Sequence, residues 1–223
     1  MSNLLFDPIK TQSSVTDSVI VAFSGGKNSI VTLDLCFKYF KNVVPFFMYL
    51  VPNLEFQENM LQRYEKRYNT KIVRLPHFEL SEMLKYGALT LPDYNISVVT
   101  INDIYAYMRN ETGFEWIAAG ERCADSIVRN AMIKKSGSID YKRGRFYPLA
   151  YWKKQEVMQY IKYKKLYLSP EQKKIGFSFR SLAGVELATI KELYPSDFEK
   201  IEKVFPYAGA AVEHYLKFEK KDG

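Results

Sequence analysis

The first two-thirds of the chain alternates short apolar runs with longer amphipathic segments. The apolar runs are rich in β-branched and aromatic residues, which favours buried strands. These predicted strands cover 15–23, 43–51, 71–75, 115–119 and 145–149. Apolar residues at helical spacing predict helices over 29–40, 55–68, 79–86, 102–109 and 153–164, and a loop entering a helix over 122–135. This alternation predicts an α/β fold, with a mostly parallel five-stranded sheet, helices on both faces and right-handed crossovers.

The last quarter of the chain has a different pattern, because strand-like runs fade beyond Leu166. Helical spacing continues there, and the predicted helices cover 181–193, 196–205 and 207–220. Pro195 and Pro206 separate these helices, since proline restricts the backbone and lacks an N–H donor. The sequence therefore predicts an α/β domain over 15–165 and a helical C-terminal appendage over 166–223.

A glycine-containing loop follows the first predicted strand and leads into the first predicted helix. Its sequence is Phe23-Ser24-Gly25-Gly26-Lys27-Asn28-Ser29. In an open parallel sheet, ligands bind at the carboxyl ends of strands, and a helix N-terminus there offers N–H groups and a positive dipole to an anion. The glycines let the backbone approach phosphate oxygens, while the serines add hydroxyl donors and the lysine adds a mobile charge. The loop is therefore a candidate phosphate site.

Two better-known phosphate motifs do not match this loop. A Walker-type loop needs glycine five positions before Gly26 and serine or threonine after Lys27, where this chain has Val21 and Asn28. The dinucleotide fingerprint fails because the two glycines are adjacent and no third one follows. The simpler alternative is a Ser-Gly-Gly turn with a helix cap. Its position behind a buried strand favours the phosphate site.

The loop resembles the Ser-Gly-Gly-x-Asp-Ser loop of the PP-loop ATP pyrophosphatases, whose fold is of the adenine nucleotide alpha hydrolase type. Phe-Ser-Gly-Gly-Lys over 23–27 is most similar to the branch that holds phosphoadenosine phosphosulfate (PAPS) reductases and the small subunit of bacterial sulfate adenylyltransferase. The resemblance implies that residues 23–29 bind the pyrophosphate portion of ATP, or the phosphate or sulfate of PAPS or adenylyl sulfate. Asn28 stands where the family has Asp. A carboxylate that can help organise Mg²⁺ is thus replaced by an amide that can still bond phosphate.

A second segment of the same branch follows the fourth predicted strand. The sequence Gly120-Glu-Arg-Cys-Ala-Asp-Ser-Ile-Val-Arg129 resembles the family's Gly-x-Arg-x-x-(Asp/Glu/Gln)-Ser-x-x-Arg signature. Arg122 and Arg129 can form forked bonds to phosphate or sulfate. Asp125 is a candidate for orienting an arginine or holding a metal–water cluster, and Ser126 for a ligand or a helix cap. An isolated group of this kind would be a surface ion-pair network, but the position after a strand favours a site.

Weaker matches occur elsewhere in the family's order. Val51-Pro-Asn-Leu-Glu-Phe56 resembles the acidic, aromatic loop beside the nucleotide, in which Asn53 or Glu55 would bond a ribose or a substrate. A turn with a helix cap is a nearly equal alternative for this segment. The remaining matches are the family's Pro-Leu-x-x-Trp-x-x-x-x-Val segment at 146–157 and two stretches, 195–198 and 205–207, that resemble the tail of phage-type members.

The chain has two cysteines, Cys36 and Cys123, and two histidines, none in a metal-ligand spacing. Four thiolates for an iron–sulfur cluster are excluded by this count, as is a C-terminal catalytic cysteine of the kind PAPS reductases use. Cys123 lies inside the arginine signature, where a passive small residue is the favoured interpretation over a thiol nucleophile. We therefore expect no thiol-dependent reduction, no protein metal site and no cluster.

The resemblance implies an enzyme of sulfur or nucleotide metabolism that cleaves ATP between the α and β phosphates and transfers the adenylyl group. Lys27, Arg122, Asp125 and Arg129 are the implied catalytic residues, and Mg²⁺ would arrive bound to the nucleotide. The alternative is a catalytically weakened nucleotide-binding subunit that acts with a protein or nucleic-acid partner, which the Asn28 replacement motivates.

The net charge of +7 suits a nucleotide or nucleic acid. Lysines and tyrosines interleave over 141–145 and 160–167, where phosphates and stacked bases could be bound, although a solvated helix face is the simpler interpretation. The N-terminal sequence lacks a signal-peptide pattern, and the longest apolar run, 43–52, is about half a membrane span. We expect a cytoplasmic protein without a membrane segment, and the sequence leaves homo-oligomers open.

Overall fold

The computed structural model describes residues 3–219, which form two compact units. The first unit contains residues up to 47 together with 64–73 and 105–167. The second contains 48–63, 74–104 and the chain from 168 onward. The predicted division at 165/166 into an α/β domain and an appendage stays a prediction.

A mostly parallel sheet runs through the fold, as the apolar runs predict. Its strand order is β3-β2-β1-β4-β6-β5. The strands are β1 (Ser18–Ala22), β2 (Asn42–Tyr49), β3 (Val73–Pro76), β4 (Ile117–Ala118), β5 (Ile139–Asp140) and β6 (Arg145–Phe146). In the parallel pairs, Val19 lies opposite Val43 and Ile20 opposite Ile117. The prediction of five strands was one too few, because β5 has two residues, too few for a pattern, and pairs antiparallel with β6.

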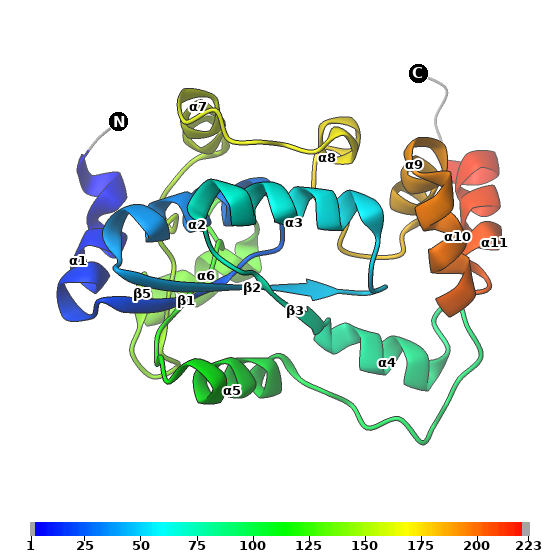
Figure 1. The fold of residues 1–223 in the computed structure, drawn as a ribbon, viewed down its shortest axis with the longest axis horizontal. Helices are drawn as coiled ribbons and strands as arrows, with labels where there is room; N and C mark the ends of the chain where they lie inside the picture. The colour runs from blue at the N-terminus through cyan, green and yellow to red at the C-terminus, as the bar shows by residue number, and fades with distance from the viewer. Residues whose placement is uncertain (1–2, 220–223) are drawn as a thin grey trace. The chain divides into compact units, whose positions relative to one another are not determined.

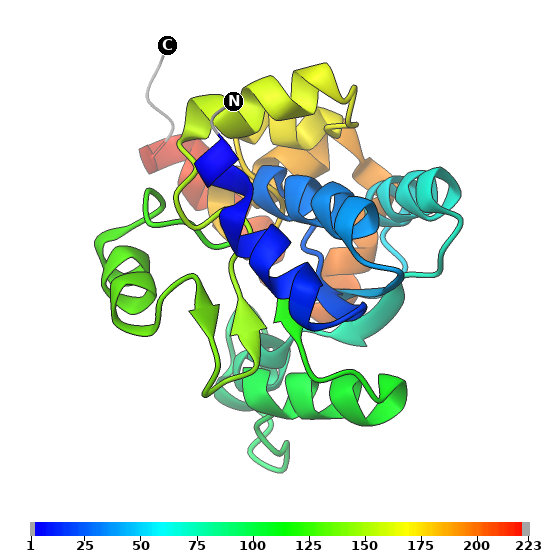
Figure 2. The same cartoon turned by 90° about the vertical axis from the view of Figure 1, so that its left-hand side faces the viewer.

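The centre of the first unit is β1, whose residues Val19, Ile20 and Val21 are fully buried. Helix α2 (Lys27–Tyr39) covers one face of this strand and α5 (Ile101–Thr112) covers the other (Figures 1 and 2). Burial on both faces explains why this strand is continuously apolar rather than alternating. Helices α1 (Asp7–Val15) and α7 (Lys154–Tyr163) both pack against α2.

Two helices lack a clear sequence signal. Helix α1 begins at Asp7 with proline in its first turn and buries few apolar residues, among them Ile9, so its amphipathic pattern is weak. It follows the short 3-10 helix η1 (Asn3–Phe6). Helix α8 (Pro170–Ile175) is shorter than two turns, which is too short for a period. The loop predicted to enter a helix does so at α6 (Ile127–Ser136).

The second unit is mostly helical. It contains most of α3 (Glu55–Tyr68), α4 (Phe78–Tyr86), α8, α9 (Gly184–Leu193), α10 (Pro195–Val204), α11 (Ala208–His214) and the π-helical turn η2 (Tyr215–Glu219). Phe56 joins the start of α3 to the C-terminal helices, because its ring stacks on Tyr194 at 5.0 Å and meets Phe179 edge-on at 5.7 Å. Within the described residues, no helix is long and apolar enough to cross a bilayer.

Candidate phosphate site

The loop after β1 has the local geometry of an open helix start. Phe23 is anchored in the core, where its amide donates to the Phe46 carbonyl at 2.9 Å and its ring meets Tyr64 at 5.3 Å. The backbone then turns at Gly25, whose φ of 71° favours glycine. Helix α2 starts at Lys27, and its N-cap residue is Gly26, which has no side chain to cap the helix. The first turn is therefore arranged to face a ligand rather than a capping side chain.

The two serines brace the loop from within. The Ser24 hydroxyl donates to Ser29 Oγ at 3.2 Å, and the Ser29 hydroxyl donates to the Gly26 carbonyl at 2.9 Å. The Gly26 amide in turn points at Ser24 Oγ at 3.4 Å. Each hydroxyl keeps lone pairs for other donors, so the serines hold the loop's shape and can still exchange bonds when an anion enters.

Gly120 brings the arginine signature against this loop. A Cβ at this position would lie 3.1 Å from the Ser29 nitrogen and 3.2 Å from the Asn28 carbonyl carbon. Because both are backbone atoms in the first turn of α2, any larger residue would push the strand end and the helix apart. The glycine therefore acts by permitting close approach of β4 to the loop.

Asp125 links the signature to the loop. Its carboxylate accepts from Arg122 Nη2 at 2.6 Å and from the Arg122 amide at 3.0 Å. Arg129 Nη1 lies 3.4 Å from the same carboxylate, and Asn28 Nδ2 donates to it at 3.2 Å. One carboxylate thus orients both arginines and the residue that departs from the family pattern. An aspartate at position 28 would instead face Asp125 as a like charge.

The two arginines differ in how firmly they are held. Arg122 is 7% exposed, its Nη1 donates to the Trp152 carbonyl at 3.2 Å, and its Nε is buried with no partner in the described chain. The Arg129 side chain is 45% exposed. A buried guanidinium with unused donor capacity suits a fixed anion contact, whereas Arg129 is free to move toward a ligand.

Lys27 is partly buried and lies near two other cations. Its pKa is lowered by partial burial and by the nearby charges of Lys154 and Arg122. Like charges held together disfavour their own charged forms unless an anion compensates them. Lys154, the first residue of α7, occupies a variable position of the 146–157 segment and was not predicted as a site residue. Only the packing of α7 against α2 brings it to the site.

The remaining predicted residues have structural partners. Ser126 caps α6, with its hydroxyl accepting from the Arg129 amide at 3.2 Å. Cys123 packs beside Tyr147 and Ala150. Asn53 and Glu55 belong to the second unit, where the Asn53 carbonyl accepts from Lys200 and the Glu55 amide donates to Asp197. Across residues 3–219, no group of three or more His, Cys, Asp or Glu side chains is arranged to hold a metal.

A parallel sheet with a Ser-Gly-Gly loop at the end of its central strand, and with arginines beside that loop, defines a protein of the PP-loop ATP pyrophosphatase class. Residues 18–175 match the phosphoadenosine phosphosulfate reductase domain family, and the chain belongs to this family.

Individual relatives are distant. An uncharacterized protein of Methanocaldococcus jannaschii is 26% identical over 212 residues, which cover 87% of this chain and 42% of the relative. The chain spans about half the length of the curated relatives it matches. The PAPS reductase of Candida auris, solved with phosphate, has a TM-score of 0.54 at 14% identity over 79% of this chain and 87% of its own. An NH₃-dependent NAD synthetase of Campylobacter jejuni has a TM-score of 0.52 at 13% identity, covering 99% and 95% of the two chains. These two structures share the fold.

Proposed function

We propose that the chain binds ATP, or a sulfonucleotide of the same adenylyl type, with its phosphates in the 24–29 loop. The observation that carries the proposal is the position of the glycine loop at the start of α2, where Lys27 and the buried Arg122 lie close enough, together with Lys154, for their charges to lower the pKa of Lys27. Asp125 already pairs with Arg122, and a bound phosphate would add a further anion close to these cations. Membership of the PAPS reductase domain family supports an adenine nucleotide as that anion.

With ATP, the supported reaction is adenylyl transfer. A nucleophilic oxygen of the acceptor attacks the α phosphorus, the bond from that phosphorus to the bridging oxygen breaks, and pyrophosphate leaves with the bridging electrons. Lys27, Arg122 and Arg129 would stabilise the charge that develops on the leaving pyrophosphate. Asp125 would hold the guanidinium groups in place for that role.

Magnesium fits this scheme as a companion of the nucleotide. Asp125 is already bonded to two arginines and an amide, so its carboxylate has little capacity left for a direct metal bond. Mg²⁺ usually keeps several waters and binds through substrate phosphates. When bound it would neutralise phosphate charge, while the residues of this chain position the nucleotide.

The test compares Lys27→Ala with Lys10→Ala, an exposed lysine on α1 that serves as the matched control. Calorimetry with ATP and with PAPS measures binding, and a coupled assay measures pyrophosphate release. We expect Lys27→Ala to weaken nucleotide binding about tenfold or more and the control to bind like wild type. Release of orthophosphate in place of pyrophosphate would contradict α–β cleavage, and equal binding by both variants would contradict the site.

A second candidate function is a nucleotide-binding subunit that has lost turnover. It is favoured by one observation, the commitment of the Asn28 amide to Asp125 in place of a second carboxylate. In this second candidate function, the residue that distinguishes this chain from the family pattern holds the arginine signature instead of helping to bind Mg²⁺.

Asn28→Asp separates the two candidates. The new carboxylate would face Asp125, so one of the pair would be protonated or the two would share a cation. If pyrophosphate release rises with added Mg²⁺, the loop is catalytically competent and only weakened. Tight ATP binding without release in both forms would favour the subunit. Asn28→Ala controls for loss of the amide bond alone.

A further inference from the structure

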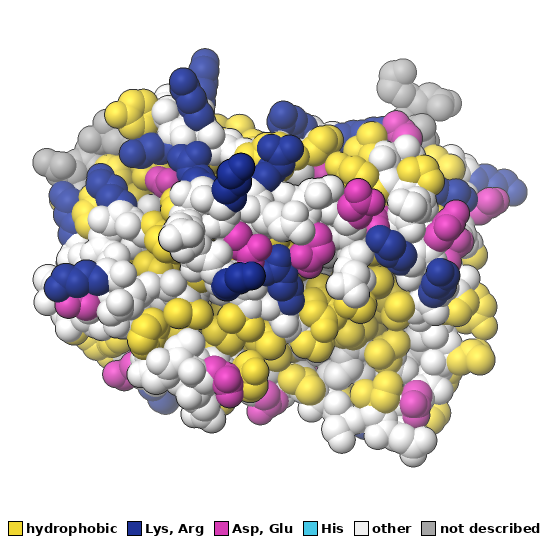
Figure 3. Space-filling view, in the orientation of Figure 1, with side chains coloured by type: hydrophobic (Ala, Val, Ile, Leu, Met, Phe, Trp, Pro, Cys, Tyr) yellow, Lys and Arg dark blue, Asp and Glu magenta, His cyan; other side chains and the backbone are white. Residues whose placement is uncertain are grey.

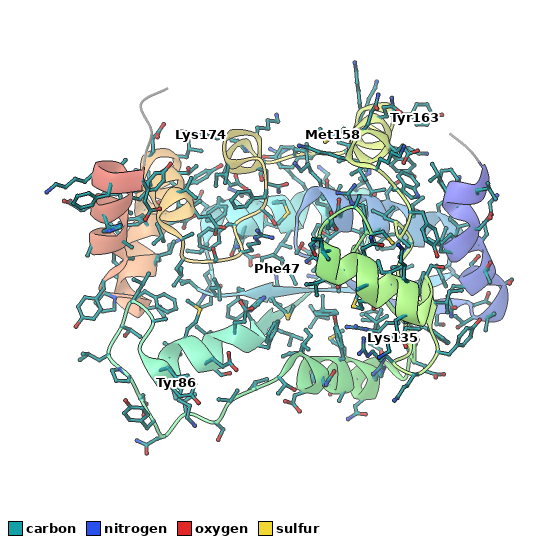
Figure 4. The ribbon with its side chains drawn as sticks, turned by 180° about the vertical axis from the view of Figure 1, so that it is seen from behind. Phe47, Tyr86, Lys135, Met158, Tyr163 and Lys174 are labelled. Carbon is teal, nitrogen blue, oxygen red and sulfur yellow. The ribbon has the colours of Figure 1, made fainter. Side chains whose placement is uncertain are left out.

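Helix α7 carries an exposed face that is both basic and aromatic. Lys154, Met158 and Lys162 follow one another at helical spacing of four along this face, and Tyr163 stands beside them. Tyr163 is 78% exposed and Met158 is 38% exposed. Figure 4 shows the Tyr163 ring projecting outward from α7, and Figure 3 shows lysine or arginine side chains standing above the same helix.

The charge of this segment is one-sided. Residues 151–165 contain five lysines and one glutamate, which gives a net charge of 5 − 1 = +4. The glutamate, Glu156, is turned back to the start of the helix, where it accepts from the Lys153 amide at 2.6 Å. An ordinary solvated helix face intersperses both signs and exposes few large rings. The α7 face therefore has the composition of a binding surface for a polyanion.

The position of α7 connects this face to the phosphate site. The Trp152 carbonyl, two residues before α7, accepts from Arg122. Helix α7 then packs against α2, the helix that starts at the phosphate loop. Lys154 lies at the start of α7, and Lys162 lies about 12 Å farther along the helix. The two lysines therefore place positive charge both near the loop and farther along the surface of the first unit.

We propose that the α7 face binds a single strand of nucleic acid, with phosphates on Lys154 and Lys162 and a base stacked on Tyr163. A single strand fits better than a duplex because only an unpaired, unstacked base offers its face to a tyrosine ring. The Lys164 ammonium lies 5.6 Å from the Tyr163 ring centroid, so the stacking platform also carries a positive charge. The surface goes beyond the nucleotide chemistry proposed above and supplies a macromolecular partner beside that site.

The test is fluorescence anisotropy on the full chain with labelled 12-nucleotide DNA and RNA strands of mixed sequence. We expect the double variant Lys162→Gln/Tyr163→Ala to raise the Kd about tenfold or more, because it removes a phosphate contact and a stacked base. The single variant Lys162→Gln should lower the slope of log Kd against log salt by about 0.7. DNA and RNA arms show which strand is preferred.

Matched controls make the result specific. Lys135→Gln removes an exposed lysine at the end of α6 (Figure 4), and Tyr94→Ala removes a ring that is 72% exposed in the second unit. Both should leave the Kd within about twofold. Circular dichroism checks that every variant is folded. The proposal would be overturned if no strand bound, or if the control variants raised the Kd as much as the test variants. It would also be overturned, in favour of an acidic protein partner, if polyglutamate bound more tightly than the strands and the test variants weakened that binding.

Failure of this proposal is distinguishable from failure of the nucleotide proposal. Lys162→Gln/Tyr163→Ala should bind ATP like wild type, because neither side chain belongs to the phosphate site. Lys27→Ala should lose ATP binding while keeping most strand binding. If the double variant binds the strand as tightly as wild type and also binds ATP normally, the α7 proposal fails and the nucleotide proposal stands.

Discussion

The charge state of Lys27 should make nucleotide binding depend on pH. Burial and the charges of Lys154 and Arg122 lower its pKa below the ordinary value of 10.5. A bound phosphate favours the protonated form, so nucleotide affinity should fall as pH rises through this lowered pKa. Calorimetry from pH 7 upward should show the fall beginning earlier than an ordinary lysine would produce.

Lys27→Arg is the control for this pH dependence, since a guanidinium keeps its charge throughout the range. The arginine variant should bind nucleotide with a flatter pH profile. A profile that is the same in both proteins would mean that another group titrates.

At the same scale, the sequence and its family resemblance predicted residues of the loop and of the arginine signature, which the structure brings together, but not the bonds between them. Asn28 is visible as a departure from the Ser-Gly-Gly-x-Asp-Ser pattern, yet its hydrogen bond to Asp125 joins residues that are 97 positions apart. Lys154 was missed because it occupies a variable position of the 146–157 segment and its place beside the loop depends on helix packing. Contacts of this kind follow from tertiary structure and leave no local signal.

Among the elements, the start of α3 depends on a residue of another helix. The Asp197 carboxylate, 1% exposed, accepts from the Glu55 amide at 2.8 Å and the Phe56 amide at 2.9 Å, and it pairs with Lys200 at 2.7 Å. It caps α3 in place of a local side chain. Asp197→Ala should lower the free energy of unfolding by about 2–4 kcal/mol, because it leaves two amides without their acceptor and removes the ion pair with Lys200. Urea unfolding followed by circular dichroism measures this.

A matched control is Asp103→Ala, which removes an exposed carboxylate that bonds Thr100 near the start of α5. Because this bond is local and solvated, its loss should lower the free energy of unfolding clearly less than Asp197→Ala does. Comparable losses in both variants would show that the cross-helix cap adds nothing beyond an ordinary one.

How far each element could be predicted follows from its length and burial. The 14-residue α3 has strong amphipathic spacing, and its predicted bounds are those observed. Strand β1, whose three central residues are fully buried, was predicted from its apolar run. The predicted range began at Val15, and its first three residues belong to α1 and a short connection. The two-residue β5 and the short α8 have too few positions for any period to appear.

For the whole molecule, the C-terminal helices complete a core that begins much earlier in the chain. Leu50, Val51, Leu54 and Phe56 are buried in one apolar cluster with residues of α9, α10 and α11. A fragment that ends at residue 167 would expose these side chains to water. We expect this fragment to bind a hydrophobic dye and to self-associate, as measured by fluorescence and size-exclusion chromatography beside the full chain. A monomeric fragment with cooperative unfolding would show instead that the first part folds alone.

The charge cluster at the phosphate loop also affects how fast a ligand arrives. Lys27, Lys154, Arg122 and Arg129 lie near the carboxylate of Asp125, and together these five groups carry 4 − 1 = +3. A field of this sign attracts a diffusing polyanion before any contact forms, and added salt screens it. In stopped-flow mixing, the association rate constant for a nucleotide should therefore drop with ionic strength far more than the dissociation rate constant changes.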